Sequence, residues 1–132
     1  GQGGGESRER MWDTGYGQDT ETWAWIQRLI ALRSELPPLV GGELTVRFAS
    51  DEDGFSEVDH AGLLAYERQL DGERVLVVLN AHALKESSGP IPTGFTAGVE
   101  LRDRIGDGVL TVDGDGSVAV LLPPRGAMVL AP

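Results

Sequence analysis

The segment "GLLAYERQLDGERVLVVLNA", residues 62–81, decides the fold class. Both halves are rich in apolar residues, and the tight-turn dipeptide Asp71-Gly72 lies between them. The segment therefore predicts an antiparallel hairpin of strands 62–69 and 73–81. Because the run VLVVLN (75–80) is apolar at successive positions, it fits a central strand that is buried on both faces.

Similar short segments of alternating polarity lie on both sides of this hairpin. Turn signals such as Gly89-Pro90 and Gly106-Asp107-Gly108 separate them. Short strands without a second helix are typical of an antiparallel sandwich or barrel, and a sandwich usually has about 100 residues. We expect a mainly β fold, an antiparallel Greek-key β-sandwich preceded by one amphipathic α-helix. The predicted strands are 44–49, 62–69, 73–81, 98–103, 108–113, 117–122 and 126–131.

The alternation also predicts which side chains form the core. Residues on one face of a strand recur at every second position, and the apolar face is the buried one. On this basis we expect nine residues to be largely buried: Leu64, Tyr66, Val75, Val77, Leu79, Val118, Val120, Leu122 and Val129.

The segment "TWAWIQRLIALRSELPPL", residues 22–39, predicts the helix. Asp19 or Thr20 can cap it, it runs to about Leu36, and Pro37-Pro38 ends it. On a helical wheel its large apolar side chains cover about half of the circumference, which is more than one sheet needs. We expect this helix to pack on two bodies; the alternative is an ordinary broad amphipathic helix. The arc consists of Trp23, Trp25, Ile26, Leu29, Ile30, Leu32 and Leu36.

Arg33 lies inside this apolar arc. An unpaired guanidinium is costly in apolar surroundings, so Arg33 needs an acceptor from a neighbouring surface, unless its head reaches water. If the helix lacks its second body, we expect self-association through Trp23, Ile26, Ile30 and Arg33.

Composition narrows the classes of function. The chain has 132 residues and a net charge of −10, so anionic nucleic acids and lipid surfaces are disfavoured partners. It has no cysteine, which excludes disulfides and thiolate zinc sites. Its beginning, "GQGGGESRER" without Met, suggests a piece of a longer protein or a processed tag.

Candidate chemical sites are weak, and we expect no catalytic, cofactor-binding or metal-binding residues. Glu57, Asp59 and His60 form an acid–base cluster that fits an acidic loop better. The stretch "DGDGS" (113–117) resembles a calcium loop but lacks the required glycine and final acid, so a tight hairpin turn explains it better. His60 and His82 lack the spacing of metal ligands.

Three stretches resemble the α-amylase family of glycoside hydrolases (glycoside hydrolase family 13). "WAWIQRLIALRSELPPL" (23–39) is similar to the last helix of that family's catalytic barrel. "GLLAYERQLDGERVLVVLNAHA" (62–83) and "VAVLLPPRGAMVLAP" (118–132) are similar to strands of its C-terminal domain. Upstream, "ESRERMWD" (6–13) resembles the loop before that helix, although the usual Asp-Pro is missing.

The resemblance implies a division of the chain. Residues 1–18 would be a loop remnant of a (β/α)₈ barrel, 19–37 the last barrel helix and 43–132 the C-terminal all-β domain. The longer enzyme would be a retaining hydrolase or transglycosylase acting on α-glucosidic bonds in starch-type glucans. Its three catalytic carboxylates come from earlier barrel strands, so this chain would be structural, with the barrel of the same parent chain as its partner.

Two alternatives from other classes remain. A carbohydrate-binding module needs exposed flat aromatic side chains, and the three tryptophans (Trp12, Trp23, Trp25) all lie before the β-region. An immunoglobulin-like interaction domain normally begins directly with a strand rather than with a helix.

Overall fold

The computed structural model describes residues 17–53 and 55–132. Contacts divide the chain into two units, Gly1–Glu35 and Leu36–Pro132, which we describe separately. Most of the expected loop remnant, residues 1–16, and the motif at 6–13 lie outside the described residues.

In the first unit, helix α1 spans Glu21–Glu35. Thr20 caps it, since the Thr20 Oγ1 accepts a hydrogen bond from the Trp23 backbone N–H at 3.1 Å. Glu21 in the first turn and Arg33 in the last turn have the charges that the helix dipole favours. The predicted helix is therefore present, and of its two candidate caps Thr20 makes the capping bond.

A second, four-residue helix, α2 (Pro38–Gly41), opens the second unit and was not predicted. Pro37-Pro38 follows the end of α1, as expected. The fixed φ of proline also suits the first turn of a helix, so the same two prolines begin helix α2. Gly42 follows without space for a side chain, because a Cβ there would lie 2.6 Å from the Pro38 carbonyl oxygen and 2.9 Å from that of Gln69.

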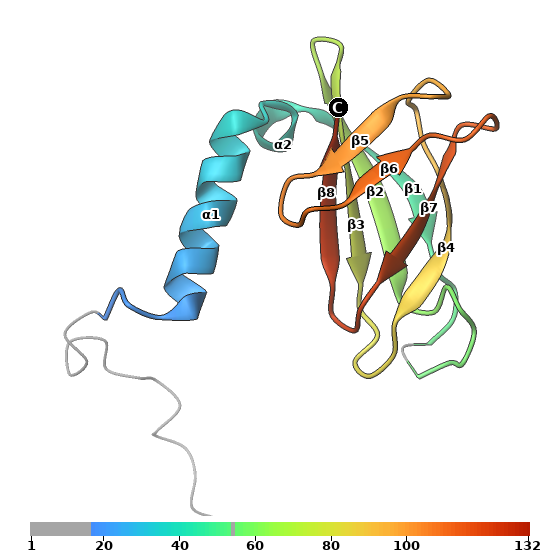
Figure 1. Ribbon diagram of the computed structural model, residues 1–132, viewed down its shortest axis with the longest axis horizontal. Helices are drawn as coiled ribbons and strands as arrows, with labels where there is room; N and C mark the ends of the chain where they lie inside the picture. The colour runs from blue at the N-terminus through green and yellow to red at the C-terminus, as the bar shows by residue number, and fades with distance from the viewer. Residues whose placement is uncertain (1–16, 54) are drawn as a thin grey trace, which may run out of the picture. The chain divides into compact units, whose positions relative to one another are not determined.

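The second unit is a β-sandwich of eight strands (Figure 1). A six-stranded sheet has the order β1-β2-β3-β8-β5-β6, and a two-stranded sheet pairs β4 with β7. All pairings are antiparallel. The strands are β1 Glu43–Ala49, β2 Leu63–Leu70, β3 Glu73–Asn80, β4 Ser87–Pro92, β5 Glu100–Asp103, β6 Val109–Thr111, β7 Ser117–Leu122 and β8 Ala127–Ala131.

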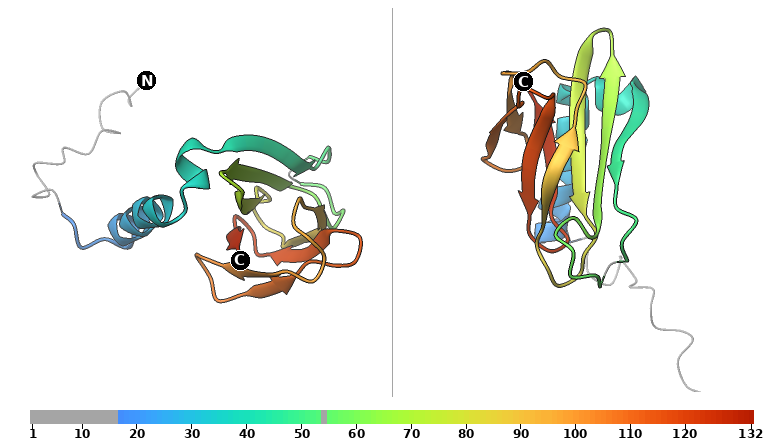
Figure 2. Two further views of the ribbon diagram at one scale, coloured as in Figure 1. Left: turned by 90° about the horizontal axis from the view of Figure 1, so that it is seen from above. Right: turned by 90° about the vertical axis from the view of Figure 1, so that its right-hand side faces the viewer.

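The connections confirm the predicted Greek key. β8 returns to lie between β3 and β5, after the chain has crossed to the small sheet to form β7. β1 also contacts β4, and β6 contacts β7, so the large sheet curls until its edges meet the small sheet (Figure 2).

The hairpin of β2 and β3 is confirmed, with Leu63 opposite Asn80 and Leu70 opposite Glu73. β3 is buried on both faces, as predicted for the run VLVVLN. β4 was missed because Gly89-Pro90 was interpreted as a turn. Proline is tolerated in an edge strand, because one side of such a strand needs no N–H donor for a neighbouring strand. β4 is such a strand, since β7 is its single neighbour.

The core between the sheets consists of Leu63, Ala65, Leu76, Val78, Ile91, Leu101, Val112, Val118, Val120, Leu122 and Leu130. Six of the nine predicted core residues are buried: Val75, Val77, Val118, Val120, Leu122 and Val129. The prediction is wrong for Leu64, which is 37% exposed, and Tyr66 and Leu79 are only half-buried. Since β2 turns Leu63, Ala65 and Glu67 inward, its other face points away from the core.

Glu67 is a fully buried carboxylate on the inner face of β2, with 1% of its surface exposed. Its Oε2 accepts hydrogen bonds from Arg47 of β1 (2.5 Å) and Arg74 of β3 (2.6 Å). Its Oε1 accepts one from the backbone N–H of Gly94 at 2.6 Å. A Cβ at Gly94 would collide with both guanidinium groups, so the backbone approaches this closely because the residue is glycine. We call these four residues the Glu67 clamp.

The clamp coincides with a bulge in β1. Val46 pairs with Tyr66 and Phe48 with Ala65, so Arg47 is the extra residue. The bulge lets Arg47 reach Glu67 and also directs Phe48 to the core side, where it packs against the core cluster.

We expect Leu76→Ala to lower the free energy of unfolding by about 2–5 kcal/mol, because it opens a cavity between the sheets. The control Leu121→Ala, at a position 55% exposed on β7, should cost less than about 0.5 kcal/mol. Urea unfolding followed by circular dichroism measures both. Equal losses would mean that the core is misplaced.

We expect Glu67→Leu to cost about 3–5 kcal/mol, because it leaves two arginines without their shared acceptor. The triple variant Arg47→Met/Glu67→Leu/Arg74→Met should recover most of that loss, since it removes the charges together. Glu73→Leu, an exposed carboxylate on β3, is the matched control. A Glu67→Leu protein as stable as the control would show that the clamp contributes nothing.

Candidate functional site

The most exposed apolar surface of the first unit is one side of α1. Its large apolar side chains are exposed over 36–61% of their surface: Trp23, Trp25, Ile26, Leu29 and Ile30. These are five of the seven residues of the predicted arc, whereas Leu32 is buried. The Arg28 guanidinium lies 5.9 Å from the Trp25 ring centroid, a cation–π distance. Arg33 is exposed. The helix thus presents apolar side chains that a soluble protein normally covers.

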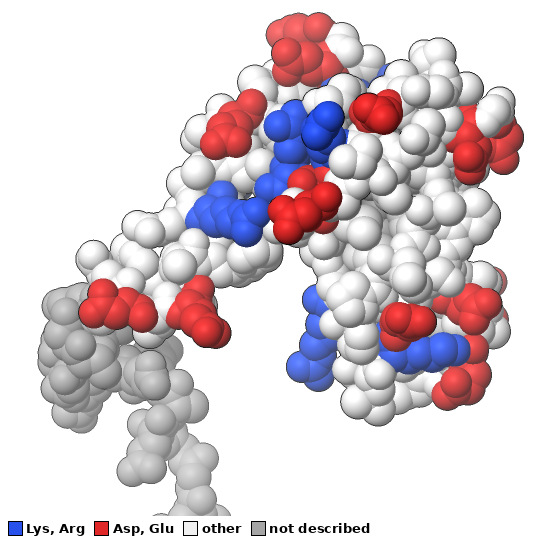
Figure 3. All heavy atoms as spheres, in the orientation of Figure 1, with Lys and Arg blue, Asp and Glu red and all other residues white. Residues whose placement is uncertain are grey.

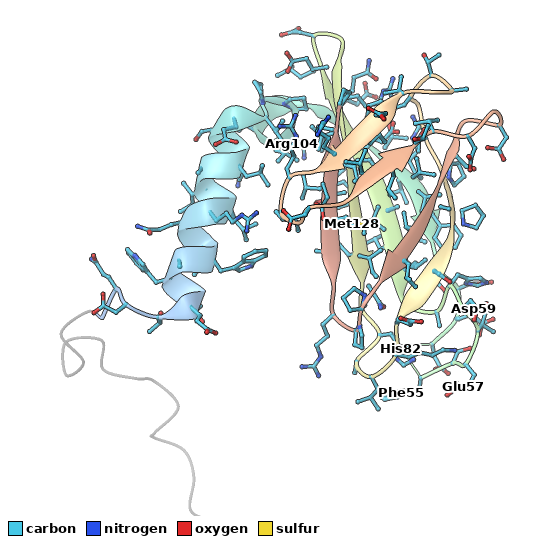
Figure 4. All side chains as sticks on the ribbon, viewed as in Figure 1. Phe55, Glu57, Asp59, His82, Arg104 and Met128 are labelled. Carbon is cyan, nitrogen blue, oxygen red and sulfur yellow. The ribbon has the colours of Figure 1, made fainter. Side chains whose placement is uncertain are left out.

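The three residues of the suspected acid–base cluster, Glu57, Asp59 and His60, have separate partners in the structure. Glu57 is exposed and pairs with Lys85 at 3.5 Å, and the Asp59 backbone oxygen accepts a bond from the Ser88 N–H. The His60 Nδ1 lies 3.2 Å from the Ser50 hydroxyl, and its ring meets the edge of Phe48. Each residue thus binds a different neighbour and helps to order the loop between β1 and β2 (Figure 4).

A buried polar cluster around Asn80 was missed by the sequence interpretation. The Asn80 amide donates to the carbonyl oxygens of Lys85, Leu122 and Pro123 at 2.9–3.2 Å. Its oxygen accepts bonds from the His82 N–H and the Ser87 hydroxyl. One side chain therefore joins the loop after β3 to the turn between β7 and β8. The sequence did contain a signal for this cluster: a polar asparagine ends an apolar strand that was predicted to be buried, and a buried polar side chain needs hydrogen-bond partners.

His82 is buried within this cluster. Its Nδ1 accepts hydrogen bonds from the backbone N–H groups of Leu84 and Lys85, at 3.2 and 3.0 Å. An acceptor nitrogen carries no proton, so the neutral ring has its proton on Nε2. Figure 4 shows His82 at the same end of the sandwich as Glu57. The side chain orders a loop through Nδ1, which leaves that nitrogen no role as a metal ligand.

The acidic turn at 113–117 is also structural. The Asp115 carboxylate accepts hydrogen bonds from the Ser117 hydroxyl (2.7 Å) and N–H (3.0 Å), which hold the pKa of Asp115 below its ordinary value. Gly116 adopts a φ of 83°, which glycine reaches without strain. The predicted tight turn is present, because the Asp113 N–H donates to the Ser117 carbonyl oxygen and the Gly116 N–H donates to that of Asp113. It does not join a hairpin, since it carries the chain from β6 to β7 in the other sheet.

Among the described residues, no group of three or more His, Cys, Asp or Glu side chains could hold a metal ion. Within the same residues, no helix is long and apolar enough to cross a membrane. On the face drawn in Figure 3, basic and acidic side chains are both present, and the acidic ones lie in several separate groups.

Solved structures similar to this chain include the α-amylase of Anoxybacillus, with 22% identity, a TM-score of 0.67 and 86% of this chain covered. The α-amylase of Malbranchea cinnamomea has 18% identity, a TM-score of 0.66 and covers 94%. The γ-CGTase of the alkalophilic Bacillus clarkii has 25% identity, a TM-score of 0.64 and covers 89%. The matching segments are 23%, 25% and 17% of those chains, respectively.

The comparison with curated proteins found no match. The family model described as maltogenic amylase, C-terminal domain, matches residues 54–129, which is more than half of the chain. This range contains β2 to β7 and most of β8. The chain belongs to the maltogenic amylase C-terminal domain family, as its sandwich and its structural neighbours also indicate.

Proposed function

We propose that this chain is the non-catalytic C-terminal part of an enzyme that cleaves or transfers α-glucosidic bonds in starch-type glucans. In this proposal residues 19–37, which contain α1, are the last helix of the catalytic (β/α)₈ barrel. Residues 43–132 are the C-terminal domain, and residues 1–18 belong to a barrel loop. The partner is the rest of that barrel in the same parent chain.

The exposed arc of α1 is the observation that carries this proposal. Apolar surface left in water costs roughly 25 cal/mol per Å², so an arc with two tryptophans and two isoleucines favours a covering body. Barrel helices pack on barrel strands and on neighbouring helices, which is how a wide arc is buried. Arg33, in the last turn, would then find its acceptor at the same interface.

The carboxylates of the sandwich support a non-catalytic role. A retaining glycosidase needs two carboxyl groups about 5–5.5 Å apart, one to attack the sugar and one to transfer the proton. Glu67, the buried acid, already accepts bonds from two arginines and a backbone N–H. Both oxygens of this carboxylate are therefore already engaged by donors of the sandwich itself, so the side chain suits a structural role.

We expect the isolated chain to release no chromophore from a chromogenic maltooligosaccharide. A heat-denatured sample is the control, and the assay should run at enzyme concentrations that reveal slow turnover. Activity of the native chain above this control would overturn the non-catalytic assignment. Saturable binding of maltoheptaose in calorimetry would instead favour a carbohydrate-binding module.

We expect the isolated chain to self-associate through α1 at micromolar concentration, because its arc has no barrel to cover it. Trp23→Glu/Ile30→Glu should yield monomers in sedimentation velocity. The control Ala24→Glu/Ala31→Glu adds the same charge to the opposite, exposed side of α1 and should still associate. If the unmodified chain and both variants sediment as the same monomer, α1 does not drive association.

A further inference from the structure

The loop between β3 and β4 is held in its path by one histidine ring. His82 is 4% exposed, and its Nδ1 accepts hydrogen bonds from the backbone N–H groups of Leu84 (3.2 Å) and Lys85 (3.0 Å). Its own backbone N–H donates to the Asn80 side-chain oxygen at 2.8 Å. We call the two bonds to Nδ1 the His82 latch. Because a single atom holds two successive N–H groups, the path of residues 83–85 depends on the state of that atom.

The latch requires an Nδ1 without a proton. A ring nitrogen accepts hydrogen bonds through its lone pair, and protonation turns it into a donor. A protonated Nδ1 would direct its hydrogen at two other N–H donors, so both bonds of the latch would be lost together. Histidine is the side-chain type that ordinarily changes its charge under mild acidification. The loop is therefore fastened to an acceptor that acid removes.

The second ring nitrogen gives the closed loop an internal cost. Nε2 carries the proton of the neutral ring, and it is buried without a hydrogen-bond partner in the described part of the chain. Such a donor has lost the hydrogen bond to water that it makes when exposed. Opening of the loop would return Nε2 to water. The ring thus stabilises the closed loop through Nδ1 and destabilises it through Nε2, which narrows the free-energy gap between the closed and open forms.

The surroundings of His82 offer no counter-ion to a charged ring. The segments packed against it are its own loop, the end of the β1–β2 loop at Gly62 and the β7–β8 turn. The charged or titratable side chains of these segments are Lys85, Glu86, Glu57, Asp59, His60 and Arg125. Glu57 pairs with Lys85, and within the described residues no carboxylate pairs with the His82 ring. A charged ring in the closed loop would therefore be buried and unpaired, which is costly.

The latch also governs a contact between two loops. Lys85 is the single lysine of the chain, and its Nζ donates to the Glu57 backbone oxygen and pairs with the Glu57 carboxylate at 3.5 Å. Figure 4 shows Glu57 and His82 at the same end of the sandwich. Since Nδ1 of His82 positions the backbone of Lys85, loss of the latch would withdraw Lys85 from Glu57.

We propose that His82 is an acid-sensitive switch, whose protonation opens the loop of residues 82–85 and detaches Lys85 from Glu57. The direction follows from counting protons. Nδ1 binds no proton while the loop is closed and can bind one when it is open, so a fall in pH favours the open loop. A return to neutral pH restores the latch. The inference is independent of the proposed function, because it uses only contacts within the sandwich.

Nuclear magnetic resonance of the ¹⁵N-labelled 132-residue chain, between about pH 7.5 and pH 5, tests this switch above the ordinary range of carboxylates. The ¹⁵N shifts of the His82 ring report protonation of Nδ1. Exchange of the Leu84 and Lys85 amides with water, corrected for its intrinsic pH dependence, reports opening. Both should change with the same midpoint, and protection of the two amides should fall about tenfold or more. The Leu76 amide of β3 should keep its protection throughout.

Two matched variants identify the responsible group. His82→Asn carries an amide oxygen in place of Nδ1 and does not titrate in this range, so its loop should stay closed at the acid end. His60→Asn removes the other histidine of the chain and should open as the unmodified chain does. Circular dichroism at neutral pH verifies that both variants are folded.

Several results would overturn the inference. One is protection of the Leu84 and Lys85 amides at the acid end in the unmodified chain. Others are acid opening of His82→Asn with the midpoint of the unmodified chain, or loss of the transition in His60→Asn. If His82→Asn is unfolded or already open at neutral pH, the unmodified chain decides: different midpoints for ring protonation and amide exchange contradict the switch, and a shared midpoint supports it.

Discussion

The buried carboxylate of Glu67 is the interaction on which the arrangement of the sandwich most depends. It holds β1, β2 and β3 and the segment around Gly94 through three short hydrogen bonds. A buried charge is tolerated only when it is paired and hydrogen-bonded, so the strands must keep the register that brings these donors together. The bulge at Arg47 follows from this need, and it fixes Phe48 inward and Val46 outward.

The same clamp explains the main error in the predicted core. In "LLAYERQL" both faces are apolar, with Leu63 and Ala65 on one side and Leu64 and Tyr66 on the other. Alternation with a period of two cannot decide which of these two faces is buried. The charge of Glu67, which lies on the same face as Leu63, favours exposure of that face. The structure selects that face because Arg47 and Arg74, 20 and 7 residues away, neutralise the acid. No local pattern contains this pairing.

The hairpin of β2 and β3, the central position of β3 and the Greek key could be predicted, because alternation and turn residues act over a few positions. β4 could not, since Pro90 and Pro92 make a poor local strand and only pairing with β7 stabilises it. For the candidate site, the sequence predicted the arc on α1 through its helical period. It did not predict that Leu64 is exposed, because exposure depends on which face β2 turns inward.

The exposed apolar arc of α1 is buried if this helix belongs to a catalytic barrel, as proposed above. Calorimetric unfolding of the chain joined to its upstream sequence tests this directly. Docking through a buried interface couples the two parts, so the joined protein should unfold in one transition, and the sandwich should melt at a higher temperature than the 132-residue chain does alone. Two independent transitions, with the sandwich melting at its isolated temperature, would contradict the proposal that a barrel completes this chain.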